Sequence, residues 1–233
     1  MGYDCDKIAD LNDFERQVLL LLSQGDKIYE IIRQRILDHT YVPSQALVES
    51  NLAEELGVSR NTIKKALLRL SNDKLVVFKA NKSAIVKSLT IEEAVNLFEI
   101  RERVEGLIAY LGAQVISEKE LDIIKENLDN MKACLEKGDL MGYSKTNDII
   151  HNVLYSICPN EDAIDIIQSI RLQLRRYNKR TILISGRSHD SFNEHQNIYL
   201  ALRDKDADKA EMMMRRHIRN VREVLKENYN LLF

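Results

Sequence analysis

The sequence contains no tryptophan, only two prolines and only eight glycines among its 233 residues. Residues that break helices are therefore scarce, whereas leucine, isoleucine, glutamate and lysine are abundant. This composition predicts a mainly helical chain and excludes an all-β sandwich, which needs many tight turns. Apolar residues make up 45% of the chain, which is enough to give each of two modest domains a core.

Cysteines and long apolar runs are also few. Cys5, Cys134 and Cys158 are far apart and form no CxxC pair, so the sequence indicates neither a disulfide framework nor a thiolate zinc site. The densest apolar run, residues 18–22, is too short to span a bilayer, and the N-terminus is acidic, unlike a signal peptide. We therefore expect a soluble cytoplasmic protein with reduced thiols.

Three parts are predicted along the chain. Residues 1–26 form an acidic extension that ends in a short helix, and we assign this part no function. Residues 27–88 form a small domain, and residues 89–233 form an all-helical domain whose first helix is capped by Thr90 and Glu93 in a capping box. Sequence breaks around Pro159, Gly186 and similar positions divide this last part into about six helices.

The small domain has the sequence pattern of a winged helix-turn-helix. An amphipathic helix is expected over residues 27–38, a second helix over 50–56, and a third over 61–71. Gly57 suits the turn between the second and third helices, and Ser59 can cap the third. Residues 75–78 and 84–86 then predict a β-hairpin, the wing.

The charge of this segment indicates a nucleic-acid partner. The whole chain has a net charge of -2, but residues 58–88 carry eight basic side chains against one acid, a local excess of +7. A charged helix face is most often simply solvated. Because the excess coincides with a helix-turn-helix and a hairpin, we favour binding to double-stranded DNA.

The segment resembles the winged helix-turn-helix of GntR-type regulators. The matching positions are Pro43, Leu47, Glu49, Leu52, Ala53, Leu56, Gly57, Val58, Ser59, Arg60, Ala66, Leu67, Leu70, Leu75 and Val76. Ser44 and Lys74 stand where that family usually has glycine, and Asn61 and Thr62 replace its usual Thr-Pro pair. The resemblance implies a dimer that reads an operator, with DNA contacts from Ser59, Arg60, Asn61, Thr62, Lys64, Lys65 and Lys82. Arg60 and Lys64 would read bases in the major groove.

Histidines in the helical part suggest a metal site. Asn147 and His151 are four residues apart on one helix and share a face. His195 and His217 lie on the last two predicted helices, so an antiparallel arrangement would let them face each other. Three imidazoles and one side-chain oxygen suit a first-row transition metal with positions for exchangeable ligands. Each histidine alone is more often an ordinary polar residue, and we assign only that role to His39 and His189.

Residues 90–233 resemble the FCD subfamily of GntR regulators, the FadR-type subfamily. The matching residues are Glu99, Ile100, Arg101, Glu105, Asn147, His151, Glu194, His195, Arg216 and His217. The resemblance implies a divalent metal, zinc or nickel, held by an aspartate and three histidines; here Asn147 replaces the aspartate, and Asp148 beside it is the alternative. It also implies an organic-acid effector, for which Arg101 is our first binding candidate, followed by Arg171 and Arg175.

Taken together, these features favour a repressor whose operator affinity is controlled by an effector. One alternative is a metal-dependent enzyme that uses the three histidines, but the sequence has no HExxH motif and no nucleophile elbow. Another is a helical interaction protein whose basic segment docks on an acidic partner; steep salt dependence of duplex binding would argue against it.

Overall fold

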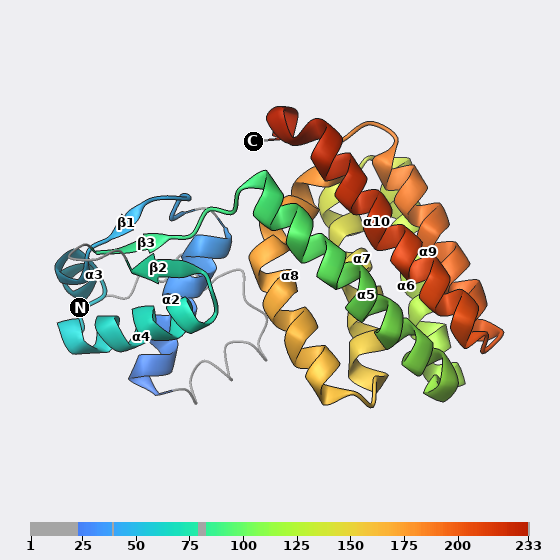
Figure 1. Cartoon of the computed structure of the whole chain (residues 1–233), viewed down its shortest axis with the longest axis horizontal. Helices are drawn as coiled ribbons and strands as arrows, with labels where there is room; N and C mark the ends of the chain where they lie inside the picture. Colours follow the sequence, from blue (N-terminus) through green and yellow to red (C-terminus); the bar gives the residue numbers. More distant parts are fainter. Residues whose placement is uncertain (1–22, 39, 79–82, 233) are drawn as a thin grey trace. The chain divides into compact units, whose positions relative to one another are not determined.

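The computed structural model describes residues 23–38, 40–78 and 83–232, and the chain divides into two compact units, Met1–Ser88 and Leu89–Phe233 (Figure 1). The first described helix is α2. Residues 1–22, which include most of the expected acidic extension and its short helix, lie outside the described residues. Residues 24–26, which were also counted with the extension, belong to α2. Over the described residues the protein is mainly helical, as the composition predicts.

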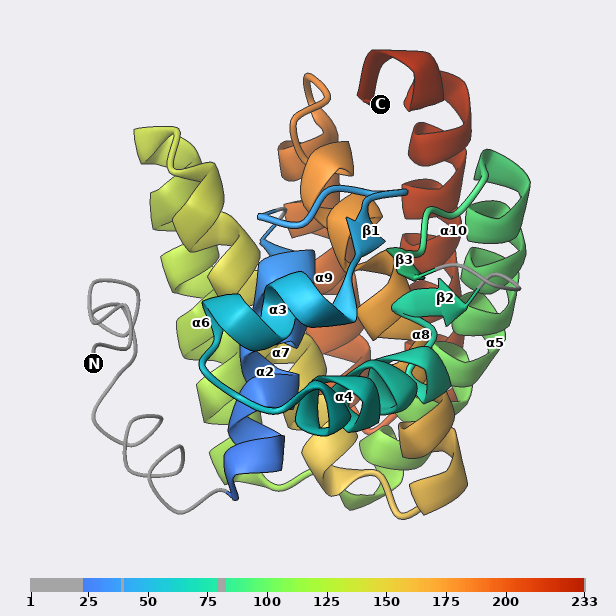
Figure 2. The same cartoon turned by 90° about the vertical axis from the view of Figure 1, so that its left-hand side faces the viewer.

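The first unit combines three helices with a small antiparallel sheet (Figure 2). Its elements in chain order are α2 (Gln24–Leu37), β1 (Ala46–Leu47), α3 (Glu49–Glu55), α4 (Arg60–Asn72), β2 (Val76–Phe78) and β3 (Ala84–Val86). Strand β3 lies in the middle of the sheet, pairing Val77 with Ile85 on one side and Leu47 with Ala84 on the other. The predicted wing is present, and β1 is an additional strand that the sequence analysis missed.

Local signals explain where these helices begin. Helix α2 starts three residues before the predicted position because the Ser23 side chain accepts a hydrogen bond from the backbone N–H of Asp26. Ser59 caps α4 in the same way, by accepting from Thr62 N at 3.1 Å. Apolar residues of α2 and α4, including Ile32, Ile63 and Leu67, are fully buried and form the core of the unit.

Two positions where the family usually has glycine adopt left-handed backbone conformations in this chain. Ser44 has φ +65° and Lys74 has φ +59°. Lys74 follows α4 in a Schellman motif, in which Lys74 N donates to Ser71 O and Leu75 N donates to Leu70 O. The turn geometry is therefore kept although the glycine is absent, at a cost of about 1–2 kcal/mol for a left-handed L-residue.

The second unit consists of six helices within the described range 89–232: α5 (Ile91–Val115), α6 (Glu118–Lys137), α7 (Leu140–Ile157), α8 (Glu161–Thr181), α9 (Arg187–Arg203) and α10 (Ala207–Leu232). The expected capping box is present at Thr90 and Glu93, and Gly138 and Gly186 lie at helix ends with positive φ. No helix in the part of the chain that the structure describes is both long and apolar enough to cross a membrane.

Helices α5 and α10 pack side by side along much of their length (Figure 1). Gly106 permits this approach, because a Cβ atom there would lie 2.5 Å from Cγ of Arg215. Buried tyrosines tie further segments to the bundle: Tyr143 donates to Ser188 O and Tyr177 donates to Leu89 O. This packing fixes the side chains of α5, α7, α9 and α10 that point into the bundle.

The substitution Lys74→Gly should stabilise the protein. Glycine removes the left-handed strain but increases the conformational entropy of the unfolded chain, so we expect a net gain of about 0.5–1 kcal/mol. In urea denaturation, this gain in the free energy of unfolding should appear as a higher midpoint concentration of urea. Lys65→Gly is the matched control: Lys65 is exposed within α4, where glycine should cost about 1 kcal/mol. An equal loss of unfolding free energy in both variants would contradict this explanation.

Candidate functional site

Helix α4 presents a polar, basic face at its N-terminal end. Its exposed side chains in the first two turns are those of Arg60, Asn61, Lys64 and Lys65, all predicted DNA contacts. The opposite face is apolar and buried in the first unit. A helix with this division can enter the major groove while its other face holds it to the domain.

Two predicted phosphate contacts also have a structural role. The Ser59 hydroxyl caps α4 and lies 2.9 Å from the Thr62 hydroxyl. The capped N-terminus directs the remaining first-turn N–H groups outward, an arrangement that favours phosphate. Lys82 lies outside the described residues.

One basic residue of α4 is already neutralised. Arg69 pairs with Asp26 at 2.5 Å, and its guanidinium lies 4.1 Å from the centre of the Tyr29 ring. Its charge therefore contributes less to a phosphate-binding surface than the charge count over residues 58–88 suggests. The basic groups in the first turns of the helix have no ion-pair partner among the described residues, so they are the better candidates for DNA.

The second unit brings together the three histidines that the sequence analysis selected. His151 comes from α7, His195 from α9 and His217 from α10, and all three are buried. One ring nitrogen of each lies within 4.8 Å of one ring nitrogen of the others. The Nε2 atoms of His151 and His195 are 3.4 Å apart. We call these residues the histidine centre.

Each histidine is held at Nδ1 by a neighbouring oxygen. His151 Nδ1 lies 2.7 Å from a carboxylate oxygen of Glu105, and His217 Nδ1 lies 2.7 Å from one of Glu194. His195 Nδ1 lies 2.7 Å from the carbonyl oxygen of Ser191. Such outer contacts orient metal-binding histidines and leave Nε2 as the available ligand atom.

The two carboxylates are themselves held in place. Glu105 is fully buried and forms an ion pair with Arg101 on the same face of α5. Glu194 accepts from Arg187 at 2.8 Å and from Asn220 at 2.6 Å. The histidine centre thus depends on side chains from α5 as well as from the three helices that supply its imidazoles.

The pKa shifts favour neutral imidazoles at His195 and His217 beside ionised carboxylates at Glu105 and Glu194. Burial lowers the pKa of His195 well below its usual value, and the neighbouring histidines lower it further. Burial also lowers the pKa of His217 to about 4, although Glu194 opposes the shift. Burial raises the pKa of Glu105, but Arg101 and His151 outweigh this and hold it well below the usual range. Neutral imidazole is the form that binds a metal.

These observations test whether a metal fits the residues present. Two ligands about 2.1 Å from one tetrahedral ion are about 3.4 Å apart, which agrees with the His151 to His195 separation. Three buried, oriented imidazoles form a donor set suited to zinc or nickel. The histidine centre can therefore hold a divalent metal, with Nε2 atoms as ligands.

The fourth predicted ligand, Asn147, lies one turn before His151 on α7 and is half-buried. Its alternative, Asp148, is exposed and pairs with Arg171 at 2.8 Å. That ion pair engages Asp148 away from the three histidines, and the cluster of candidate ligands does not include it. Asn147 remains the predicted fourth ligand.

The predicted effector-binding arginines differ in their surroundings. Arg101 is buried and contacts Glu105, so it is part of the support of the histidine centre. Arg171 also donates to Asn152 and lies 4.9 Å from the centre of the Tyr155 ring. Arg175 follows one turn later on α8 and is half-buried.

The sequence analysis did not assign roles to the oxygens that hold the histidines. Glu105 and Glu194 were noted only as matching residues, and Ser191 was not noted. The available signal for Glu105 was an acid between apolar residues on a helix, a position that normally requires a partner. Ser191 acts through its backbone, so its side chain gave no signal.

Comparison with known proteins agrees with this architecture. Residues 24–86 match the model of the bacterial regulatory proteins of the gntR family, and residues 96–220 match the FCD domain model. The HTH-type transcriptional repressor RspR of Escherichia coli is 22% identical over 203 residues, covering 87% of this chain and 89% of RspR. The Uxu operon regulator of Haemophilus influenzae is 26% identical, covering 86% of this chain and 81% of that regulator.

Solved structures show the same fold. E. coli McbR/YncC superposes with a TM-score of 0.73 at 17% identity, covering 90% of this chain and all of that chain. A putative GntR regulator from Rhodococcus sp. RHA1 gives a TM-score of 0.68 at 23% identity, and the match covers 88% of this chain and 99% of that chain. The relatives are described as transcriptional regulators and not as enzymes. The chain therefore belongs to the GntR family, carries a C-terminal FCD domain, and is a DNA-binding transcriptional regulator.

Proposed function

We propose that the protein is a cytoplasmic, homodimeric repressor whose operator affinity is controlled by a small carboxylate bound at a metal in the histidine centre. The observation that carries this proposal is the set of three buried imidazoles, each held at Nδ1 by an oxygen. Burying this many polar groups is costly unless they are paired and used. A role in binding a regulatory ligand would account for such a cluster.

DNA binding is assigned to α4 through Ser59, Arg60, Asn61, Thr62, Lys64 and Lys65. Arg60 and Lys64 are exposed and free to approach base edges, and guanidinium prefers the O6 and N7 atoms of guanine. Repression in particular is supported by the similarity to RspR, which is described as a repressor. Two copies are proposed because helix-turn-helix proteins usually read two half-sites as dimers.

The metal would be held by His151, His195 and His217, with Asn147 as an oxygen donor. When bound, the metal supplies a positive centre that attracts a carboxylate. The chain's own residues orient the imidazoles and exclude water from their surroundings. Effector binding then shifts the population of dimers whose two α4 helices match the operator half-sites.

The enzyme alternative is less well supported. The relatives are regulators, and the carboxylates near the histidines contact Nδ1 atoms and so orient the imidazoles. Neither carboxylate is placed as a free general base. The remaining alternative is docking on an acidic protein partner. A steep salt dependence of duplex binding would distinguish DNA binding from it.

Arg60→Ala should weaken binding to the selected operator. A bidentate contact to guanine is worth about 1–3 kcal/mol, so the loss should be about 5- to 150-fold. Operator fragments can be selected from a random duplex pool with the wild-type protein and then titrated in gel shifts at several salt concentrations. Affinity should fall steeply with salt because several phosphates are contacted.

Arg69→Ala is the matched control for this experiment. Arg69 lies on the same helix, but its charge is engaged by Asp26, so we expect a smaller loss of operator binding. The assignment of α4 would be wrong if Arg60→Ala kept wild-type affinity and selectivity, or if duplex binding did not depend on salt.

His195→Ala should abolish tight metal binding. We expect about one equivalent of zinc or nickel per chain in the wild type, measured by calorimetric titration after chelator treatment and dialysis. His189→Ala is the control, because His189 is exposed and lies outside the histidine centre. Glu105→Gln should weaken the affinity by about 10- to 100-fold, as losses of orienting residues usually do.

A further variant tests the position of the fourth donor. Asn147→Asp restores a negative charge beside the metal and should tighten binding. Asp148→Asn should change it little, because Asp148 is exposed and paired with Arg171. Wild-type metal affinity in His195→Ala, or a larger effect of Asp148→Asn than of Asn147→Asp, would contradict the proposed site.

A further inference from the structure

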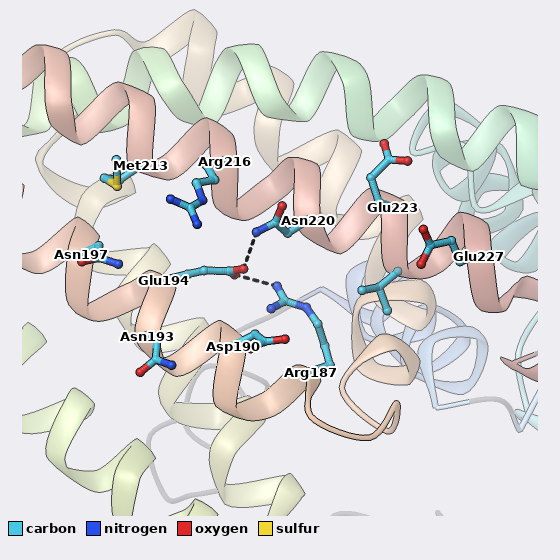
Figure 3. Close-up of a pocket in the computed structure, with 11 residues that line it drawn as sticks. Arg187, Asp190, Asn193, Glu194, Asn197, Met213, Arg216, Asn220, Glu223 and Glu227 are labelled. Carbon is cyan, nitrogen blue, oxygen red and sulfur yellow. Dashed lines mark hydrogen bonds and ion pairs between the residues drawn. The ribbon is translucent and has the colours of Figure 1, made fainter.

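A cavity lies outside the histidine centre, between α9 and α10 (Figure 3). Its volume is about 390 Å³, which is within the range of small-molecule sites. Its charged lining residues are Arg187, Asp190 and Glu194 from α9 and Arg216, Glu223 and Glu227 from α10. None of the three histidines lines it. We call it the α9–α10 cleft.

Arg187 is a buried cation with an unmet donor in this cleft. The residue is only 4% exposed. Its Nη2 atom donates to Glu194 at 2.8 Å, whereas buried Nη1 has no hydrogen-bond acceptor among the described residues. A buried donor without an acceptor is unfavourable, so a ligand oxygen at Nη1 would be stabilised. A carboxylate oxygen is the strongest acceptor for guanidinium.

The charge of the remaining wall is negative. Glu194 is already balanced by Arg187 and held by Asn220, as the dashed lines in Figure 3 show. Beyond that pair, the lining has one cation, Arg216, and three carboxylates, those of Asp190, Glu223 and Glu227. Glu223 is paired with Arg222, so Asp190 and Glu227 are the carboxylates proposed to meet a ligand. A dianionic acid would be repelled by this wall, whereas an ammonium group would be attracted to it.

Amide groups complete the lining. Asn193, Asn197 and Asn220 each offer donors and acceptors along the cleft. These groups suit a polar ligand better than an apolar one. The cleft therefore combines one unmet donor for a carboxylate with several carboxylates for amino groups.

We propose that the α9–α10 cleft binds a carboxylic acid that carries amino groups, of the class of basic amino acids. Its carboxylate accepts from Nη1 of Arg187, and its ammonium groups lie against Asp190 and Glu227. This ligand differs in charge from the organic acid proposed for the histidine centre. The two sites are separate but adjoin through Glu194, which lines the cleft and holds His217.

Calorimetric titration of the full-length protein with L-lysine tests this proposal. We expect saturable binding of one equivalent per chain, and binding at least about tenfold weaker for two probes that each lack one feature. The first probe, 1,5-diaminopentane, lacks the carboxylate, and the second, glutarate, lacks the amino groups. Both probes are titrated into chelator-treated protein, so that glutarate cannot bind at a metal in the histidine centre. The L-lysine titration with chelator present should give unchanged affinity, which separates this site from the metal site.

Variants assign the binding to the cleft. The double variant Asp190→Asn/Glu227→Gln should weaken L-lysine binding by about tenfold or more, since it removes two exposed carboxylates. Asp208→Asn is the matched control, because Asp208 is exposed on α10 but does not line the cleft. Thermal unfolding of each variant checks that the fold is retained.

Four results would overturn the proposal. They are the absence of saturable L-lysine binding up to about 10 mM, tighter binding of glutarate than of L-lysine in chelator-treated protein, wild-type affinity in the double variant, and loss of L-lysine binding on chelation. The last result would assign the ligand to the histidine centre instead. A change of oligomeric state in the double variant without a change in ligand binding would identify the cleft as a contact between copies.

Discussion

The contacts between oxygen atoms and Nδ1 of the three buried histidines are the constraint on which the histidine centre depends. Glu105, Ser191 and Glu194 each contact Nδ1 of one imidazole and orient it where α7, α9 and α10 meet. Both carboxylates are in turn bound by arginines of their own helices. Removing one member would leave a buried polar group without its partner, which costs far more than the net worth of an exposed ion pair. Burial keeps the imidazoles of His195 and His217 neutral, and the Nδ1 contacts leave the Nε2 atoms available as ligands.

The DNA-binding unit depends on the division of helix α4 into an apolar face and a basic face. Helix α4 buries an apolar face and exposes cations, and the Ser59 cap and the turn at Lys74 set its two ends. Some of its polar groups serve the domain itself: Arg69 pairs with Asp26, and the hydroxyls of Ser59 and Thr62 contact each other. The residues proposed to contact DNA are concentrated in the first two turns of the helix, the part that a helix-turn-helix directs toward base edges.

Much of the fold follows from patterns that are local in sequence. The six helices of the second unit could be predicted because Thr90, Gly138 and Gly186 mark their ends and apolar periodicity marks their faces. Strand β1 was missed because two residues are too few to show alternation. The start of α2 was placed too late because its cap, Ser23, was counted with the preceding segment.

The candidate site was only partly predictable. Residue type and spacing selected the three histidines, since metal ligands have few alternatives in a helical chain. The oxygen atoms that contact Nδ1 of these histidines could not be predicted in the same way. The contact between Glu105 and His151, for example, depends on how α5 packs against α7. The neutralisation of Arg69 and the unmet donor of Arg187 likewise arise from residues distant in sequence or from burial.

The central claim is that the histidine centre governs operator binding, and one measurement tests it most directly. Operator affinity should be measured for metal-loaded protein across a panel of small carboxylates, with His195→Ala protein titrated in parallel. The account predicts that at least one carboxylate changes the wild-type affinity by about fivefold or more, the lower end of usual allosteric coupling, and that His195→Ala removes this change. Equal operator affinity with and without every carboxylate, or an unchanged response in His195→Ala, would contradict it.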